Sequence, residues 1–183
     1  MRNDWLKFIP QIEPGYAPWL HDHGSLTRRI QLRCKVFHVR NIFNGHSLAH
    51  PDEMPLLHLP RKQHIYTREV CLYADKQPVV FAHSVVAAHH LRGAWHTLQH
   101  LGSRPLGTLL FTHPLIQRAP LRFQCLHPGH PLFRKAALQL ETVPRQLWAR
   151  RSVFSLHGAP LLVTEVFLPD ILKLTKQEIA TPL

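Results

Sequence analysis

The chain has 183 residues, 45% of them hydrophobic and 18% charged, which is typical of a globular protein and too apolar for a disordered one. Its 22 Lys and Arg outnumber 11 Asp and Glu, and the formal net charge of +11 favours an anionic partner: nucleic acid, a membrane surface or a small polyanionic metabolite. The sequence contains no zinc-finger spacing, helix-turn-helix pattern or RNP-like motif, so we expect no nucleic-acid partner.

Length and cysteine usage predict a single domain over residues 1–183 in a reducing compartment. Cys34, Cys71 and Cys125 are odd in number and far apart, which argues against a disulfide framework. The N-terminus has no apolar signal segment, and no apolar run approaches the ~20 residues of a membrane span. We therefore expect a cytoplasmic protein without a membrane span, and the scattered charge favours a monomer.

The first half of the chain predicts mainly strands. Residues 1–20 are expected to wrap the surface as a short helix and loops. A long strand is predicted from about Arg28 to Val39, because apolar residues at every second position alternate with basic and polar ones. The Pro-rich stretch 51–60 is expected to be a loop. Residues 64–74 and 78–87 are expected to form a hairpin with its turn at 75–77.

The second half mixes helices and strands. Residues 89–101 predict one helix that stops at Gly102, and residues 106–111 form a short apolar segment. The proline-interrupted region 113–146 predicts one strand at 118–126 and one helix at 132–141. A final hairpin is expected to join 147–156 to 161–168 through a turn at 157–160, before a loosely ordered tail at 170–183.

This order of elements predicts an α+β fold with a single antiparallel β-sheet of about six strands and helices covering one face. Hairpins dominate and the βαβ rhythm of a parallel sheet is missing. A sheet covered by helices on one face leaves a natural site for an enclosed pocket between the two layers.

The last strand of the predicted hairpin carries the most informative residue. Residues 161–168 form a mainly apolar run interrupted by one carboxylate, Glu165, so the strand is expected to be buried on both faces and to place this carboxylate inside the protein. A buried carboxylate is costly unless it is paired, hydrogen-bonded or protonated. Glu165 is therefore a candidate functional residue.

Arg68 is the second candidate, because alternation in the strand at 64–74 places it on the same face as Val70 and Leu72. An inward guanidinium needs an anion. The anion is either the carboxylate of Glu165 or Glu69, in an internal salt bridge, or the carboxylate of a substrate whose opposite end meets Glu165.

Other kinds of active site have weaker support. Three histidine pairs have spacings that can bind a metal, but the pair on the predicted helix has no neighbouring Glu and no recognisable third ligand, so we expect no metal site; the pairs are His46 and His50, His96 and His100, and His127 and His130. The sequence has no G-x-S-x-G motif, no cysteine in a known catalytic context and no phosphate-binding glycine loop. Gly102 and Gly107 are expected to let the backbone turn tightly beside another group.

Four blocks of the sequence together resemble the chorismate pyruvate-lyase family, the 4-hydroxybenzoate synthases. They occur in the family's order and cover most of residues 17–169. The blocks are Gly24-Ser25-Leu26-Thr27-Arg28-Arg29, Tyr66-Thr67-Arg68-Glu69-Val70-Cys71-Leu72, residues 101–111 around Arg104-Pro105-Leu106-Gly107, and Arg150-Arg151-Ser152 followed by Thr164-Glu165-Val166-Phe167-Leu168-Pro169.

The resemblance implies a chorismate lyase-like fold and cofactor-free conversion of chorismate to 4-hydroxybenzoate and pyruvate, a first committed step of ubiquinone biosynthesis in bacteria. Carried over by motif, the substrate-binding positions are Leu26, Arg68, Leu106 and Glu165. Arg68 and Glu165 are the catalytic candidates, with Arg68 expected at the ring carboxylate and Glu165 at the C4 hydroxyl. Two features depart from the family: Leu26 stands where some members have methionine, and the segment 113–146 is longer than in the shortest members.

Two alternatives remain open on the sequence. The same fold occurs in the effector-binding domains of GntR-type regulators, in which the two charged residues would only contact a ligand; the lack of a preceding winged helix-turn-helix of roughly 70 residues argues against this. A related lyase that makes a different hydroxybenzoate is the other alternative.

Overall fold

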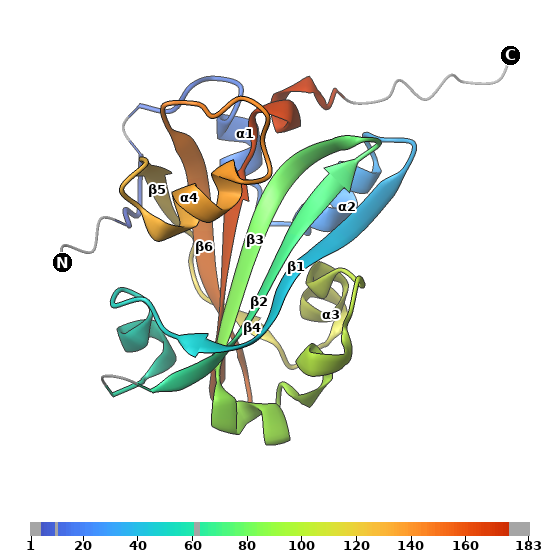
Figure 1. Cartoon of the computed structure of the whole chain (residues 1–183). Coiled ribbons are helices and arrows are strands. Elements are labelled where there is room, and N and C mark those ends of the chain that lie inside the picture. The colour runs from blue at the N-terminus through green and yellow to red at the C-terminus, as the bar shows by residue number, and fades with distance from the viewer. Residues whose placement is uncertain (1–4, 10, 61–62, 176–183) are drawn as a thin grey trace, which may run out of the picture.

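The structure is a computed structural model that describes residues 5–9, 11–60 and 63–175. Within these ranges seven strands form one antiparallel sheet in the order β1-β2-β3-β7-β6-β4, and β5 pairs with another part of β6 (Figure 1). The strands are β1 Phe37–Leu48, β2 His64–Ala74, β3 Gln77–Ala87, β4 Gln117–Arg118, β5 Arg122–Leu126, β6 Leu147–Leu156 and β7 Ala159–Phe167. The predicted α+β fold with a single antiparallel sheet is confirmed.

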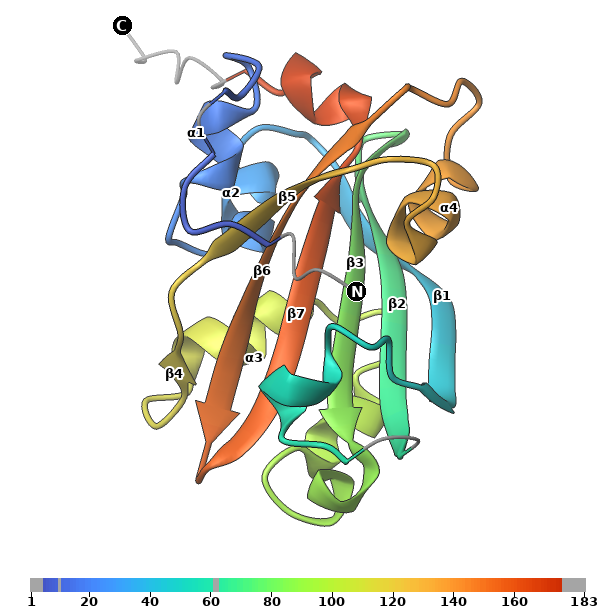
Figure 2. The same ribbon diagram turned by 90° about the vertical axis from the view of Figure 1, so that its left-hand side faces the viewer.

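The helices lie on both faces of this sheet rather than on one (Figure 2). Helices α1, α2 and α3 cover one face, named here the pocket face, and α4 packs on the opposite face against Phe81 and Val166. The α-helices are α1 Ala17–Leu20, α2 Leu26–Gln31, α3 Leu106–Thr112 and α4 Pro131–Ala137. Short 3₁₀ helices occur at Met54–Leu57, Ala88–Arg92, His96–His100 and Pro169–Lys173.

The predicted strand from Arg28 to Val39 is wrong, because its first part is helix α2 and β1 begins only at Phe37. Ser25 caps the helix by accepting a hydrogen bond from the backbone N–H of Arg28 at 3.3 Å. The apolar positions that alternate along this segment also include the i, i+4 pair Leu26 and Ile30, which α2 buries. The apolar residues of this segment therefore fit both the alternation of a strand and the i, i+4 spacing of a helix, and the helix forms.

The predicted helix at 89–101 is also wrong in type. Two 3₁₀ helices flank Gly93, which has φ −137° and ψ −114°, and the chain still buries the expected apolar positions; these are Leu91, Trp95, Leu98 and Leu101. Pro120 separates β4 from β5 where one strand at 118–126 was predicted. The helix predicted at 132–141 is the shorter α4.

Both predicted hairpins are confirmed with small shifts at their turns. β2 and β3 pair across a turn in which Asp75 has φ +55°, and β6 and β7 pair across His157 and Gly158, with φ +51° and +77°. Two residues at positive φ match the right-handed twist of the strands they join. The predicted tail begins later than residue 170, because Ile171 is buried; residues 176–183 lie outside the described residues.

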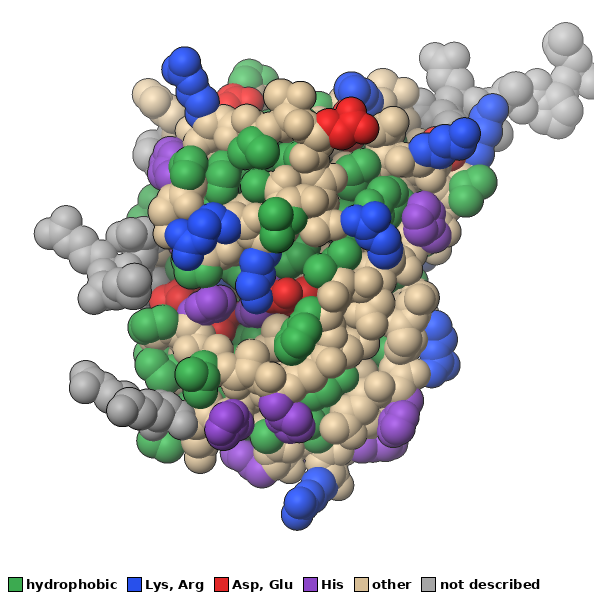
Figure 3. All heavy atoms as spheres, viewed as in Figure 1, with side chains coloured by type: hydrophobic (Ala, Val, Ile, Leu, Met, Phe, Trp, Pro, Cys, Tyr) green, Lys and Arg blue, Asp and Glu red, His purple; other side chains and the backbone are tan. Residues whose placement is uncertain are grey.

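Charged side chains are scattered over the face drawn in Figure 3. On the face drawn in Figure 3, Lys and Arg side chains stand apart from one another and form no continuous patch among the residues described there. In the same described portion of the chain, no helix is both long and apolar enough to cross a membrane.

Candidate active site

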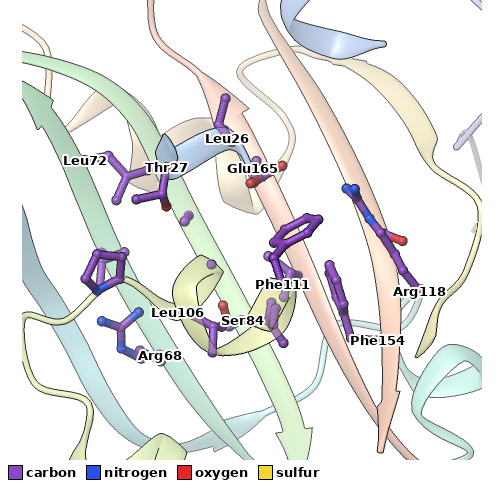
Figure 4. A pocket seen from close by; sticks show the side chains of 17 residues that line it. Leu26, Thr27, Arg68, Leu72, Ser84, Leu106, Phe111, Arg118, Phe154 and Glu165 are labelled. Atoms are coloured by element: carbon purple, nitrogen blue, oxygen red, sulfur yellow. The ribbon is translucent and has the colours of Figure 1, made fainter. Parts of the chain in front are cut away.

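A pocket lies between the pocket face of the sheet and helices α2 and α3 (Figure 4). Its floor comes from alternate residues of β2, β3, β7 and β6, and its roof from the start of α2 and from α3. The space between the lining side chains, including the part open to solvent, is about 590 Å³. Leu26, Arg68, Leu106 and Glu165 all line this pocket, so the structure brings together every site residue expected from the sequence.

The roof of the pocket depends on Gly107, where α3 approaches α2 closely. A Cβ atom at this position would lie only 2.9 Å from Thr27 Oγ1 and 3.5 Å from Ser25 Oγ. Leu26 and Leu106, 3% and 6% exposed, lie next to this contact and turn into the pocket. Gly102 has φ +52° and begins the turn that leads to α3. The two glycines thus have the backbone roles expected of them.

Arg68 is buried, and no described residue provides it with a counter-ion. The residue is 1% exposed, and its Nη2 donates to the backbone carbonyls of Gly102 and Arg104, each at 2.9 Å. Its Nε is buried without a hydrogen-bond partner among the described residues, and no carboxylate of these residues pairs with it. Burial lowers the pKa of Arg68. Of the two alternatives for the anion of Arg68, the internal salt bridge to Glu165 or Glu69 is therefore wrong, and the guanidinium lines the pocket.

Glu165 pairs with an arginine from the neighbouring strand. Arg150 lies directly across from it in the β6–β7 ladder, and Arg150 Nε donates to Glu165 Oε2 at 2.6 Å. Arg150 Nη1 also donates to the carbonyls of Trp19 at 2.9 Å and Asp22 at 2.5 Å, which fixes the chain around α1. The Glu165 side chain is 19% exposed against 1% for Arg150, and Glu165 is the one residue of β7 that is not fully buried. The carboxylate is thus held in place and opens onto the pocket.

A second pocket arginine, Arg118, was not identified from the sequence. Its Nη1 donates to the carbonyl of His23 at 2.7 Å, and its guanidinium lies 5.4 Å and 5.2 Å from the ring centres of Phe111 and Phe154. Arg118 belongs to a two-residue strand in the proline-interrupted segment, so periodicity gave no signal for it. Its place in the pocket comes from the long-range pairing with Phe154.

The opposite face of the sheet carries a buried polar row. Glu69, His83, Thr164 and Arg151 are register neighbours across β2, β3, β7 and β6. His83 Nδ1 contacts Glu69 Oε1 and its Nε2 contacts Glu53 Oε1, both at 2.9 Å. Burial lowers the pKa of His83, but the two carboxylates outweigh burial and raise it to about 9.

The histidine pairs considered from the sequence do not explain this row. Among the described residues, His50, Glu53 and His83 form one group of potential metal ligands, with ligand atoms within 4.8 Å of one another. In this structure His83 bridges Glu53 and Glu69 as a buried ion pair. The sequence feature that could have indicated this ion pair is the presence of Glu69 and His83 on adjacent predicted strands.

The fold and the motifs can be compared with known proteins. A family model described as chorismate lyase matches residues 2–177. A probable chorismate pyruvate-lyase from Nitrosospira multiformis is 50% identical over 173 residues, covering 94% of this chain and 96% of that protein. A probable chorismate pyruvate-lyase from Nitrosomonas europaea is 53% identical over 156 residues, covering 85% of this chain and 88% of that protein.

Solved structures with the same fold are distant in sequence. The effector domain of PhnF from Mycobacterium smegmatis is similar with a TM-score of 0.57 and 13% identity, covering 81% of this chain and 89% of that one. The ligand-binding domain of a putative GntR-family regulator from Bordetella bronchiseptica is similar with a TM-score of 0.55 and 16% identity, covering 74% and 86%.

Proposed function

Because this chain belongs to the chorismate lyase family, we propose that it converts chorismate to 4-hydroxybenzoate and pyruvate. The observation that carries the proposal is the buried guanidinium of Arg68, which lies in an otherwise largely apolar pocket and has no counter-ion among the described residues. A buried cation of this kind is stabilised by an anionic ligand. A ring carboxylate supplies that anion, and the apolar walls accept the ring.

The reaction is an elimination that aromatises the ring. The C3–O bond of chorismate breaks, the hydrogen on C4 leaves as a proton, and the departing enolpyruvate takes up a proton on its methylene carbon to become pyruvate. No electrons are exchanged with another molecule, and aromatisation drives the reaction forward. The proposal therefore assigns no cofactor to the enzyme.

Each part of the substrate is assigned to a different set of pocket residues. We assign the ring carboxylate to Arg68 and the C4 hydroxyl to Glu165, which as a carboxylate paired with Arg150 can accept a hydrogen bond. Leu26 and Leu106 line the slot for the ring. Positioning accounts for much of the acceleration in this scheme, since a reactive conformer held away from water has already lost the entropy that the transition state requires.

The physiological setting is also a proposal: the pathway rests on the family resemblance, and the compartment and the monomer rest on features of the sequence. We assign the product, 4-hydroxybenzoate, to ubiquinone biosynthesis and the enzyme to the cytoplasm as a monomer. Chromatography of the reaction products identifies the hydroxybenzoate isomer, and light scattering gives the mass of the enzyme in solution.

A turnover assay tests the activity. Purified protein with chorismate is expected to produce 4-hydroxybenzoate, followed by its absorbance, and pyruvate in equal amounts. Arg68→Ala and Glu165→Gln are expected to lower kcat/KM, while the exposed controls Arg145→Ala and Glu141→Gln leave it unchanged. No product from the native protein would refute the activity, and full kcat/KM in both pocket variants would refute the roles of Arg68 and Glu165.

The second candidate function is ligand binding without reaction, as the similarity to the PhnF effector domain suggests. In that case Arg68 and Glu165 would hold a ligand that stays intact. Chorismate recovered unchanged from the complex, together with saturable binding in calorimetry, would favour this candidate over the lyase.

A further inference from the structure

The substrate in the proposed function carries two carboxylates, and Arg68 accounts for one of them. The second belongs to the enolpyruvyl group on C3, the part of the molecule that leaves. The pocket contains another arginine, Arg118, on the opposite side from Arg68 and with Glu165 between them (Figure 4).

The sheet sets the distance between the two arginines. Arg68 lies on β2 and Arg118 on β4, and β3, β7 and β6 separate them. Four steps between neighbouring strands correspond to about 19 Å between their backbones. Both side chains line the same pocket, so they approach its contents from opposite ends. The pocket therefore presents a guanidinium at each end, which suits a ligand with two anionic groups.

The charge of Arg118 is not neutralised by the carboxylates around it. Its nearest acidic neighbours are Glu165 and Asp22, but Glu165 pairs with Arg150 and Asp22 pairs with Arg29, each at 2.6 Å. Arg118 forms no ion pair within the described part of the chain, and its Nε is buried without a hydrogen-bond partner there. The guanidinium therefore retains the capacity to bind an anion.

The position of Arg118 matches the C3 substituent rather than the ring carboxylate. C3 is bonded to C4, the carbon whose hydroxyl is assigned to Glu165, and Glu165 lies between the two arginines in the pocket (Figure 4). Phe111 and Phe154 flank its guanidinium and limit its rotation. The hydrogen bond from Arg118 to the carbonyl of His23 uses Nη1 only. A purely structural role for Arg118 therefore does not explain why its other nitrogens lie at the pocket.

From these observations we propose that Arg118 binds the carboxylate of the enolpyruvyl group and stabilises the negative charge that develops on it as the C3–O bond breaks. The inference rests on the proposed function and adds a second anion subsite to it. Each product then contacts a different arginine: 4-hydroxybenzoate keeps the contact with Arg68, and pyruvate keeps the contact with Arg118. Arg118 therefore recognises the substrate and contributes nothing to the affinity for the aromatic product.

Comparison of substrate kinetics with product binding tests this separation. Arg118→Gln is expected to lower kcat/KM for chorismate roughly tenfold to a hundredfold, the range of a hydrogen bond to a charged group. The Kd for 4-hydroxybenzoate, measured by calorimetry, is expected to stay within about twofold of the wild type. Arg118→Lys is expected to recover part of the loss, because it keeps the charge but not the planar fork.

Arg122→Gln is the matched control, since it removes one positive charge from the next strand without touching the pocket, and it should change neither quantity. Unchanged kcat/KM in Arg118→Gln would overturn the inference, and so would an equal loss of affinity for 4-hydroxybenzoate, which would mark a structural role. Failure of the wild-type protein to form product is a separate outcome that would overturn the proposed function itself, and the second subsite with it.

Discussion

The buried imidazolium behind the pocket floor makes folding stability depend on pH. His83 is fully enclosed between Glu53 and Glu69, and its pKa is raised from the ordinary 6.5 to about 9. A raised pKa stabilises the fold fully below pH 6.5, and this contribution is lost as the pH rises through 9. The difference corresponds to roughly 3 kcal/mol of unfolding free energy, of which about 2 kcal/mol disappears between pH 7 and pH 9.

Urea unfolding at pH 6, 7, 8 and 9 measures this contribution. His83→Gln removes the titrating group and leaves two buried carboxylates, so it is expected to lower the unfolding free energy at pH 7 by about 3 kcal/mol and to flatten its decline between pH 7 and pH 9. His100→Gln, an exposed histidine, is the control and should follow the wild type. Parallel pH curves for His83→Gln and the wild type would refute the assignment of a charged His83.

Three further predictions concern the pocket. Gly107→Ala places a Cβ 2.9 Å from Thr27 Oγ1 and is expected to lower Tm and raise KM. Adding Thr27→Ala should bring Tm and KM part of the way back to the wild-type values, and no recovery in the double variant would contradict the close contact. Arg150→Met leaves buried carbonyls and Glu165 unpaired and is expected to lower the unfolding free energy by about 3 kcal/mol. In a double-mutant cycle with Glu165→Gln, measured by urea unfolding, the two substitutions should be coupled, and strict additivity would contradict the Arg150–Glu165 ion pair. Arg68→Lys keeps the charge but loses Nη2, which donates to two loop carbonyls, and with it the planar fork that suits a carboxylate. The Kd for 4-hydroxybenzoate is therefore expected to rise roughly tenfold in calorimetry. An unchanged Kd would show that Arg68 does not bind the ring carboxylate.

Alternation along single strands was enough to place Arg68 and Glu165 in the interior, because side-chain direction has a period of two and burial fixes the register. Their partners could not be predicted in the same way. Arg68 and Glu165 lie on strands that both flank β3, opposite Ser84 and Ala82, and among the described residues Glu165 pairs with Arg150 instead. Arg150 pairs with Glu165 because β6 lies beside β7, a fact of tertiary arrangement that the local sequence does not contain.

The same limit explains the errors in the predicted elements. The segment after Ser25 satisfied both a period of two and the i, i+4 spacing of Leu26 and Ile30, and the serine cap was the signal that favoured the helix. Arg118 gave no local signal, since its strand has two residues and forms only by pairing with β6. Resemblance to a family supplied Leu26 and Leu106, which no periodicity distinguishes from other core leucines.

The four central strands carry their pocket residues and their far-face residues as direct neighbours in sequence: Arg68 with Glu69, His83 with Ser84, Thr164 with Glu165, and Arg150 with Arg151. A slip of one residue in any of these strands would exchange the two members of a pair between the faces. A slipped β2, for example, would place the carboxylate of Glu69 at the anion site and leave Arg68 among the groups that now surround His83. Misaligned molecules would therefore be unstable and also unable to bind an anionic substrate. The same charged residues thus favour correct strand alignment during folding and allow the folded protein to act on the substrate.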